Sequence, residues 1–239
     1  MMRESILAAI HGEFGRRELP EIGTVIDDIY TVILCPVCNH KTLDNHDICR
    51  HCGWEYDGFD ENHYSAANGA TMREYRDAYK KAVVAKKVFV GGSKSLSVLT
   101  QAETDLLLTY VHDDCHILIG DCRGADLAIQ NYLYSAGYSF VTVYSTEGKA
   151  RNNSGHWYVK AIDAPQDERG FDYYRQKDIA MAIEADEVLM FWDRKSKGTY
   201  HNLLDAARKN KVAHVVLRPF EVVEIKTVDE IERIRQEYV

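Results

Sequence analysis

The sequence lacks a hydrophobic segment long enough to cross a membrane. Hydrophobic residues make up 46% of the 239 residues, yet no apolar run approaches the roughly 20 residues that a transmembrane helix needs. In the N-terminal stretch MMRESILAAIHGEF, acidic and polar residues interrupt a short apolar piece, and no small-residue cleavage site follows. We therefore expect no membrane association and no signal peptide, and we expect a cytoplasmic protein.

Basic residues are also in deficit. The chain has 29 Lys and Arg against 37 Asp and Glu, which gives a formal net charge of -8. This balance disfavours a protein built mainly to coat nucleic acid. A local group of lysines at Lys80, Lys81, Lys86 and Lys87 is interpreted as a solvated helix end followed by a strand edge. Internal repeats and low-complexity segments are absent as well.

Cysteine is scarce, but four of the six cysteines fall in one short stretch, CPVCNHKTLDNHDICRHCGWEYDG (residues 35–58). Cys35, Cys38, Cys49 and Cys52 form two C-x-x-C pairs with a ten-residue spacer. Two such pairs offer four thiolates in the arrangement that Zn²⁺ prefers. A closed shell of four thiolates leaves no position for water or substrate, so we expect a structural zinc knuckle whose folding depends on the metal.

Other interpretations of these cysteines remain open. Two disulfides would need an oxidising compartment, and a thioredoxin-like redox centre would need a βαβ unit around one pair. His40, His46 and His51 are close enough in sequence to replace one cysteine as a ligand. The complete set of four thiolates makes that replacement unnecessary.

The residues around the knuckles resemble a known family. The segments CPVCNHKTL, ICRHCGWEYDG and AANGATMREYRDAYKK are similar to the cysteine-rich CPCC domain, over about residues 33–82. That family usually has adjacent cysteines in its first knuckle, where this chain has Val37. The resemblance implies metal binding, and it implies no defined activity.

From residue 86 onward, short apolar strands alternate with amphipathic helices. Strands are predicted at 86–92, 115–121, 139–145, 187–193 and 213–218, and helices at 71–85, 100–114, 124–137, 171–186, 198–211 and 227–239. Two of these helices open on capping boxes, Thr71 with Glu74 and Thr100 with Glu103. The pattern indicates an α/β fold, a Rossmann-like three-layer sandwich around a parallel sheet. We expect three segments: a helical and loop segment at 1–30, the zinc module at 31–82 and the α/β domain at 83–239.

Three loops follow strands, contain glycine and precede helices. Because ligands bind beyond the carboxyl ends of parallel strands, and helix N-termini favour anions, these loops predict a phosphate site. The candidate residues for nucleotide or phosphate binding are Gly91, Gly92, Ser93, Lys94, Gly120, Asp121, Arg123, Gly124, Ala125, Asp126, Arg151, Ser196, Lys197, Gly198 and Thr199. Glycine at strand ends is also simply how such folds turn. No loop has the spacing of a P-loop or of G-x-G-x-x-G.

The region from about residue 86 to 217 resembles the SLOG superfamily of Rossmann-like nucleotide-binding domains. The resemblance lies in the glycines and serine after the first strand, the GDCRGAD loop and the SKGT turn. It implies that the domain binds a nucleotide or an ADP-ribose-related molecule. In hydrolytic members, such as the Lonely Guy phosphoribohydrolases, paired glutamates follow the Gly-Thr. Here Tyr200, His201 and Asn202 follow instead, so the resemblance implies binding and leaves the reaction open.

Three functions therefore stay open. The first is a zinc-containing sensor that binds a nucleotide-derived small molecule, with Asp121 or Asp126 bonding ribose hydroxyls. The second is an N-glycosidic hydrolase or ribosyl transferase, for which a carboxylate must come from elsewhere; the candidates are Glu103, Asp126, Glu147 and Asp178. The third is an interaction module that binds a protein partner, or a second copy, through the zinc knuckle.

Overall fold

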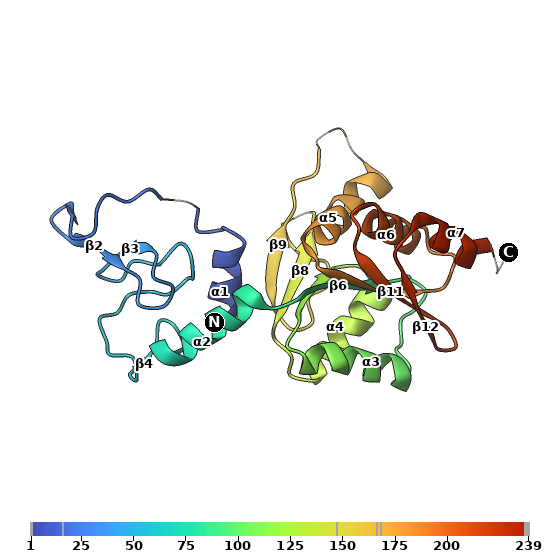
Figure 1. Ribbon diagram of the computed structural model, residues 1–239, viewed down its shortest axis with the longest axis horizontal. Helices are drawn as coiled ribbons and strands as arrows, with labels where there is room; N and C mark the ends of the chain where they lie inside the picture. Colours follow the sequence, from blue (N-terminus) through green and yellow to red (C-terminus); the bar gives the residue numbers. More distant parts are fainter. Residues whose placement is uncertain (1, 16, 147, 166, 168, 237–239) are drawn as a thin grey trace. The chain divides into compact units, whose positions relative to one another are not determined.

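The chain divides into two compact units, Met1–Ala85 and Lys86–Val239 (Figure 1). The computed structural model describes residues 2–15, 17–146, 148–165, 167 and 169–236. None of the helices in this described part combines the length and the apolar character of a membrane span. Each unit is described by itself below.

In its described residues, the N-terminal unit has two helices and five short strands. They are α1 (Met2–Ile10), β1 (Val25–Ile26), β2 (Tyr30–Leu34), β3 (Lys41–Leu43), β4 (Tyr64–Ser65), β5 (Ala70–Thr71) and α2 (Met72–Val84). Strands β1, β2 and β3 pair in that order, and β4 pairs with β5. The predicted capping box of α2 is confirmed: the Glu74 amide donates to Thr71 Oγ1 at 3.2 Å, and the Thr71 amide donates to the Glu74 carboxylate at 2.9 Å.

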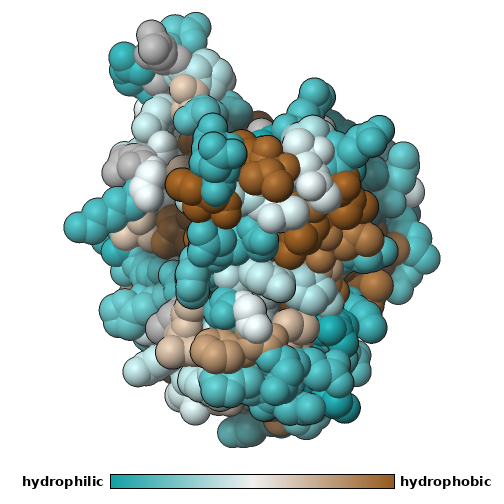
Figure 2. All heavy atoms as spheres, turned by 90° about the vertical axis from the view of Figure 1, so that its left-hand side faces the viewer, coloured by the Kyte–Doolittle hydropathy of each residue, from teal (hydrophilic) through white to brown (hydrophobic). Residues whose placement is uncertain are grey.

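The N-terminal unit has a small hydrophobic core. Trp54 and Tyr75 are buried edge to face, with ring centroids 5.1 Å apart. By contrast Ile22, Val25 and Ile29, around β1, are each more than half exposed. Brown, apolar patches lie among teal, hydrophilic residues on the surface in Figure 2. A unit that buries so little apolar surface needs an additional cross-link for stability.

The C-terminal unit is a mixed α/β domain. Its strands are β6 (Lys87–Gly92), β7 (His116–Gly120), β8 (Val141–Ser145), β9 (Tyr158–Ala161), β10 (Glu187–Trp192), β11 (Val212–Leu217) and β12 (Glu221–Ile225). Its helices are α3 (Gln101–His112), α4 (Ala125–Ser135), α5 (Gly170–Glu184), α6 (Lys197–Arg208) and α7 (Val228–Gln236). In the described chain these strands form one seven-stranded sheet in the order β12-β11-β10-β6-β7-β8-β9.

The direction in which successive strands are added to the sheet reverses next to β6. All neighbouring pairs are parallel except β11 with β12. From β6 the chain moves outward through β7, β8 and β9, and then returns to β10 on the other side of β6. Helices α3 and α4 lie on one side of the sheet, and α5, α6 and α7 on the other (Figure 1). The carboxyl ends of β6 and β10 are therefore the switch point, where ligands bind in sheets of this kind.

The α/β class and the mostly parallel sheet agree with the sequence analysis, which did not predict β9 and β12. Strand β9 has only four residues, and β12 is an edge strand with two exposed residues at its start. Neither has the continuous apolar character of the buried strands, because each lies at an edge of the sheet.

Candidate metal centre and ligand-binding cavity

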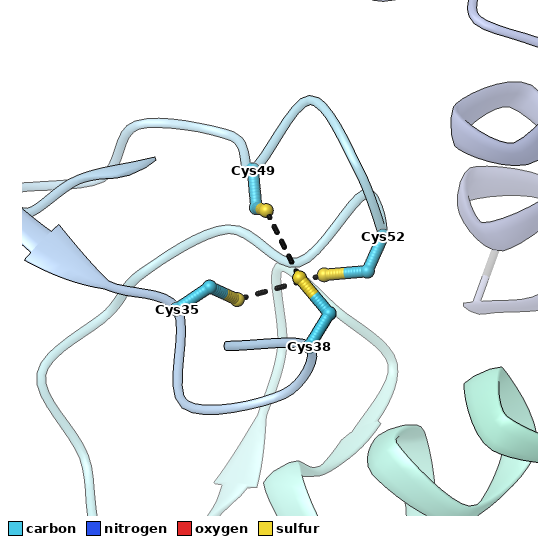
Figure 3. Close-up of side chains that lie close together, drawn as sticks. All are labelled: Cys35, Cys38, Cys49 and Cys52. Atoms are coloured by element: carbon cyan, nitrogen blue, oxygen red, sulfur yellow. Dashed lines mark hydrogen bonds between the residues drawn. The ribbon is translucent and has the colours of Figure 1, made fainter. Parts of the chain in front are cut away.

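The four cysteines of the N-terminal unit converge on one point (Figure 3). The Sγ atoms of Cys35 and Cys52 lie 3.6 Å apart, and those of Cys38 and Cys49 lie 3.5 Å apart. All four sulfurs lie within 4.8 Å of one another, and none is in a disulfide. The predicted grouping of these thiols is confirmed, and the group can hold a metal ion.

Both C-x-x-C loops have the same backbone arrangement. In the first loop the Asn39 amide donates to the Cys35 carbonyl at 2.9 Å, and in the second the Gly53 amide donates to the Cys49 carbonyl at 2.8 Å. Asn39 and Gly53 both have left-handed φ angles, 63° and 79°. Each loop thus turns back after its second cysteine, so that both of its sulfurs point to the same side.

Helix α2 holds the two loops together. The Tyr75 hydroxyl donates to the Cys52 carbonyl at 3.0 Å, and the Arg76 guanidinium donates to the Pro36 carbonyl at 2.9 Å. The nearby histidines have other contacts: His40 stacks on His51 with 3.9 Å between centroids. The group that can hold a metal ion thus consists of the four cysteine sulfurs.

Gly53 is required by its surroundings, and its substitution is a test of the knuckle geometry. A Cβ atom at this position would lie 2.4 Å from the backbone oxygen of Ser5, and φ is +79°. We expect Gly53→Ala to destabilise the N-terminal unit by about 2–4 kcal/mol, since clash and backbone strain add. Urea unfolding followed by Trp54 fluorescence measures this. Gly58→Ala is the control, because Gly58 has a similar φ and open space around it; an equal loss in both variants would show that the contact with Ser5 contributes nothing.

The C-terminal unit contains a cavity at the switch point between β6 and β10. Its volume is ≈ 270 Å³. The lining residues come from β6, the three loops that follow β6, β7 and β10, and helices α4, α5 and α6: Phe89, Gly91, Gly92, Lys94, Cys122, Asp126, Phe171, Lys177, Asp178, Ser196, Lys197, Gly198, Thr199 and Asn202. The three loops that the sequence analysis selected thus meet around one cavity.

Several of the selected residues lie outside the lining and hold the loops in place. The Ser93 amide donates to the Phe191 carbonyl, and the Ala125 amide donates to the Ser93 carbonyl. Ser93 Oγ also donates to Asp193, at 2.9 Å. Burial opposes ionisation of Asp193, but hydrogen bonds from Ser95, Ser196 and neighbouring groups outweigh it and lower its pKa. The backbone amides of Ser93 and Ala125 thus already donate hydrogen bonds within the protein, and they position the loops that line the cavity.

Asp121 and Arg151 pair with each other. The Arg151 guanidinium donates to both Asp121 oxygens, at 2.6 and 3.0 Å, and stacks on Tyr174. Burial alone would raise the pKa of Asp121, but these bonds lower it. The Asp121 carboxylate is thus occupied by Arg151 and ties the 148–157 loop to the loop after β7. The other selected residues outside the lining are Gly120, Arg123 and Gly124.

Glycine has two different roles around the cavity. A Cβ at Gly92 would lie 2.3 Å from the Phe191 oxygen, and one at Gly124 would lie 2.4 Å from the Lys94 backbone. These two glycines are required by close packing of the loops. Gly198 is different, because the nearest atom to its Cβ position is 4.0 Å away. Its missing side chain leaves the first turn of α6 open to the cavity.

A buried lysine that sequence reasoning missed lies in the cavity wall. Lys177 is 2% exposed, and its Nζ lies 2.5 Å from Asp178 and 4.0 Å from Asp121. Burial alone would lower the pKa of Lys177, but Asp178, Cys122 and Asp126 raise it, so the lysine is charged. One signal was available: Lys177 lies one turn from Met181 on the buried face of the predicted helix 171–186.

Asp126 lies in the same cluster, and its pKa is also shifted. Its pKa is raised to about 6 by burial and, to a smaller degree, by Asp178, while Lys177 opposes the shift. A carboxyl whose pKa is higher in the folded chain stabilises the fold below pH 4, and this contribution is lost as the pH rises to about 6.

Substitution of Asp126 tests this assignment. We expect the wild type to lose about 3 kcal/mol more stability than Asp126→Asn between pH 4 and 7, from roughly two pKa units at about 1.4 kcal/mol each. Urea unfolding of both proteins across this range measures the difference. Asp172→Asn, at an exposed position of α5, is the control. Parallel pH profiles for wild type and Asp126→Asn would contradict the raised pKa.

Asn202 is the second residue that the sequence analysis missed. It lies one turn after Gly198 on α6 and is 8% exposed. Its Oδ1 has no hydrogen-bond partner among the described residues. An unsatisfied buried acceptor costs about 1–3 kcal/mol, and a ligand donor in the cavity would satisfy it.

The candidate catalytic carboxylates differ in whether they line the cavity. Asp126 and Asp178 line the cavity. Glu103 does not: it is fully buried, caps α3 through the Thr100 amide and pairs with Arg218 at 3.1 Å. Its role is structural. Glu147 lies outside the described residues.

Comparison with known proteins supports the resemblance of the cysteine-containing segment to the CPCC family. Residues 33–96 match the family described as Cysteine-rich CPCC. The matched segment contains the four clustered cysteines and α2. No curated protein matches the chain. The chain thus combines a segment that matches this family with a mixed α/β domain.

Proposed function

We propose that the four cysteines bind a structural Zn²⁺ ion. Zinc bound to four sulfurs at about 2.3 Å places them about 3.8 Å apart in a tetrahedron. The distances of 3.6 and 3.5 Å between paired sulfurs are close to this edge length. The small core of the N-terminal unit makes bound zinc the main source of its stability.

We further propose that the C-terminal unit is a Rossmann-like domain of the SLOG type, and that it binds a nucleotide or an ADP-ribose-related molecule. The observation that carries this proposal is the convergence of three loops on one cavity at the switch point of the sheet. The cavity offers lysine side chains and the open first turn of α6, which suit a phosphate group.

Each group in the cavity has a role in this proposal. The first turn of α6, at Lys197 and Gly198, faces the cavity and would hold a phosphate through its backbone N–H groups. Lys94 and Lys177 supply positive charge. The Asn202 Oδ1 atom accepts a hydrogen bond from a ribose hydroxyl or from a base amino group.

A panel of ligands tests this function. The zinc-loaded protein is incubated with nucleotides, ADP-ribose, cyclic ADP-ribose, NAD and cytokinin-type nucleotides, and melting curves and products are read from the same samples. A ligand at a hundredfold excess over its Kd stabilises the protein by about 2.7 kcal/mol. A higher melting temperature with intact ligand supports a sensor. No response to any ligand would contradict nucleotide binding and favour an interaction module.

A second function is favoured by the two carboxylates in the cavity. Asp126 and Asp178 both line the cavity, and the raised pKa of Asp126 suits a proton donor or acceptor near neutral pH. The alternative is thus an N-glycosidic hydrolase or ribosyl transferase. Release of a free base in the same panel, lost in Asp178→Asn, would establish it. Intact ligands in every sample would exclude it for that panel.

A further inference from the structure

A second cavity lies beside the first turn of α6. Its volume is ≈ 360 Å³, and its lining includes Trp192, Arg194, Lys195, Lys197, Tyr200 and Arg235. It shares Lys197 with the first cavity, but its other basic residues belong to it alone. None of the candidate site residues from the sequence analysis, apart from Ser196 and Lys197, lies there.

This cavity is strongly basic in an acidic protein. Arg194, Lys195, Lys197 and Arg235 give four positive charges, and none of the described lining residues is acidic. The whole chain has a net charge of -8, so the concentration of cations is local. Among the nearby carboxylates, Glu221 lies 3.8 Å from Arg194 and is itself 60% exposed, so this ion pair is weak.

Aromatic rings hold two of the cations in place without neutralising them. The Lys197 Nζ atom lies 4.6 Å from the centroid of Phe171, and the Arg235 guanidinium lies 4.5 Å from the centroid of Tyr200. Glu232 accepts a hydrogen bond from the Tyr200 hydroxyl. Cation–π contacts orient a charge and leave it available to an anion. Four cations in one cavity, two of them oriented by aromatic rings, suit a compact ligand with several negative charges.

We propose that this second cavity binds a polyphosphate chain. The proposal does not depend on nucleotide binding in the first cavity. The planar guanidinium groups of Arg194 and Arg235 suit phosphate oxygens, and Lys195 and Lys197 add point charges. The volume is within the range of small-molecule sites, about 300–1,000 Å³.

The indole N–H signal of Trp192 provides a local readout. The chain has three tryptophans; Trp192 lines the second cavity, whereas Trp54 and Trp157 do not. The full-length protein, labelled with ¹⁵N, is titrated with inorganic tripolyphosphate at constant ionic strength. We expect a saturable shift of the Trp192 signal and unchanged signals from the other two tryptophans.

Two double variants test whether the lining cations bind tripolyphosphate. The double variant Lys195→Gln/Arg235→Gln is expected to weaken tripolyphosphate binding about tenfold or more, through loss of two charge-assisted contacts. Arg208→Gln/Lys211→Gln is the matched control; it removes the same net charge near the other end of α6 and leaves the lining intact. Equal weakening in both double variants would show general electrostatic attraction and overturn the proposal.

Lys94→Gln separates this proposal from the proposed nucleotide site. Lys94 lines the first cavity and not the second. The variant should weaken binding in the first cavity and leave the response of Trp192 to tripolyphosphate unchanged. Loss of that response in Lys94→Gln, or no Trp192 shift in the wild type, would place the ion elsewhere and overturn the proposal.

Discussion

Cys49→Ser is expected to abolish metal binding and to unfold the N-terminal unit. Cys49 is fully buried, and its sulfur lies 3.5 Å from that of Cys38 within the four-thiol group. Structural zinc sites contribute about 10–16 kcal/mol, which is as large as the whole stability of many domains. Metal analysis should fall from one zinc per chain to none. Trp54, which packs on Tyr75, should lose its native fluorescence.

Cys115→Ser is the control for this variant. Cys115 is buried in the C-terminal unit, outside the four-thiol group. It should retain one zinc per chain and a folded N-terminal unit. The signal of Trp192, which is buried in the C-terminal unit, should stay native in Cys49→Ser. A Cys49→Ser protein that retains stoichiometric zinc would contradict the assigned ligand set.

Gly198→Glu is expected to weaken ligand binding at the first cavity by about a hundredfold or more, near 3 kcal/mol. Gly198 is in the first turn of α6 and lines the cavity. A glutamate there would fill the space and place a negative charge where a phosphate is proposed to lie. Isothermal titration with the tightest ligand of the panel measures the change.

Gly198→Ala separates loss of binding from loss of folding. The nearest atom to the Cβ position of Gly198 is 4.0 Å away, so alanine fits without a clash. We expect Gly198→Ala to fold normally and to keep most of its affinity, with a change of less than about tenfold. Unchanged affinity in Gly198→Glu would remove the first turn of α6 from the binding site.

The spacing of the cysteines was sufficient to predict their cluster. A C-x-x-C loop presents its two sulfurs locally, so residues 35–52 contain nearly all the information the geometry needs. The three strand-end loops were predictable for a similar reason: the carboxyl ends of parallel strands gather at one edge of the sheet. The apolar strands and the capping box of α3 were the sequence signals for this sheet domain.

The individual contacts around the cavity could not be predicted from local patterns. Lys177 is charged in the interior because its neighbour Asp178 is joined by Cys122 and Asp126, which are more than fifty residues earlier in the chain and lie near it in the fold. The ion pair between Asp121 and Arg151 also depends on the path of the 148–157 loop, which follows β8 and not β7. Packing likewise distinguishes Gly92, which has no room for a Cβ, from Gly198, which has.

The most direct test of nucleotide binding is a ¹H–¹⁵N NMR titration of the zinc-loaded protein with ADP-ribose. The amide signals of Gly91, Lys197 and Gly198, which line the cavity at the switch point, would be followed together with those of the N-terminal unit. We predict saturable shifts centred on these three residues. The absence of any shift at high ligand concentration, or shifts confined to residues outside the cavity, would contradict the proposal that this cavity binds ADP-ribose-related ligands.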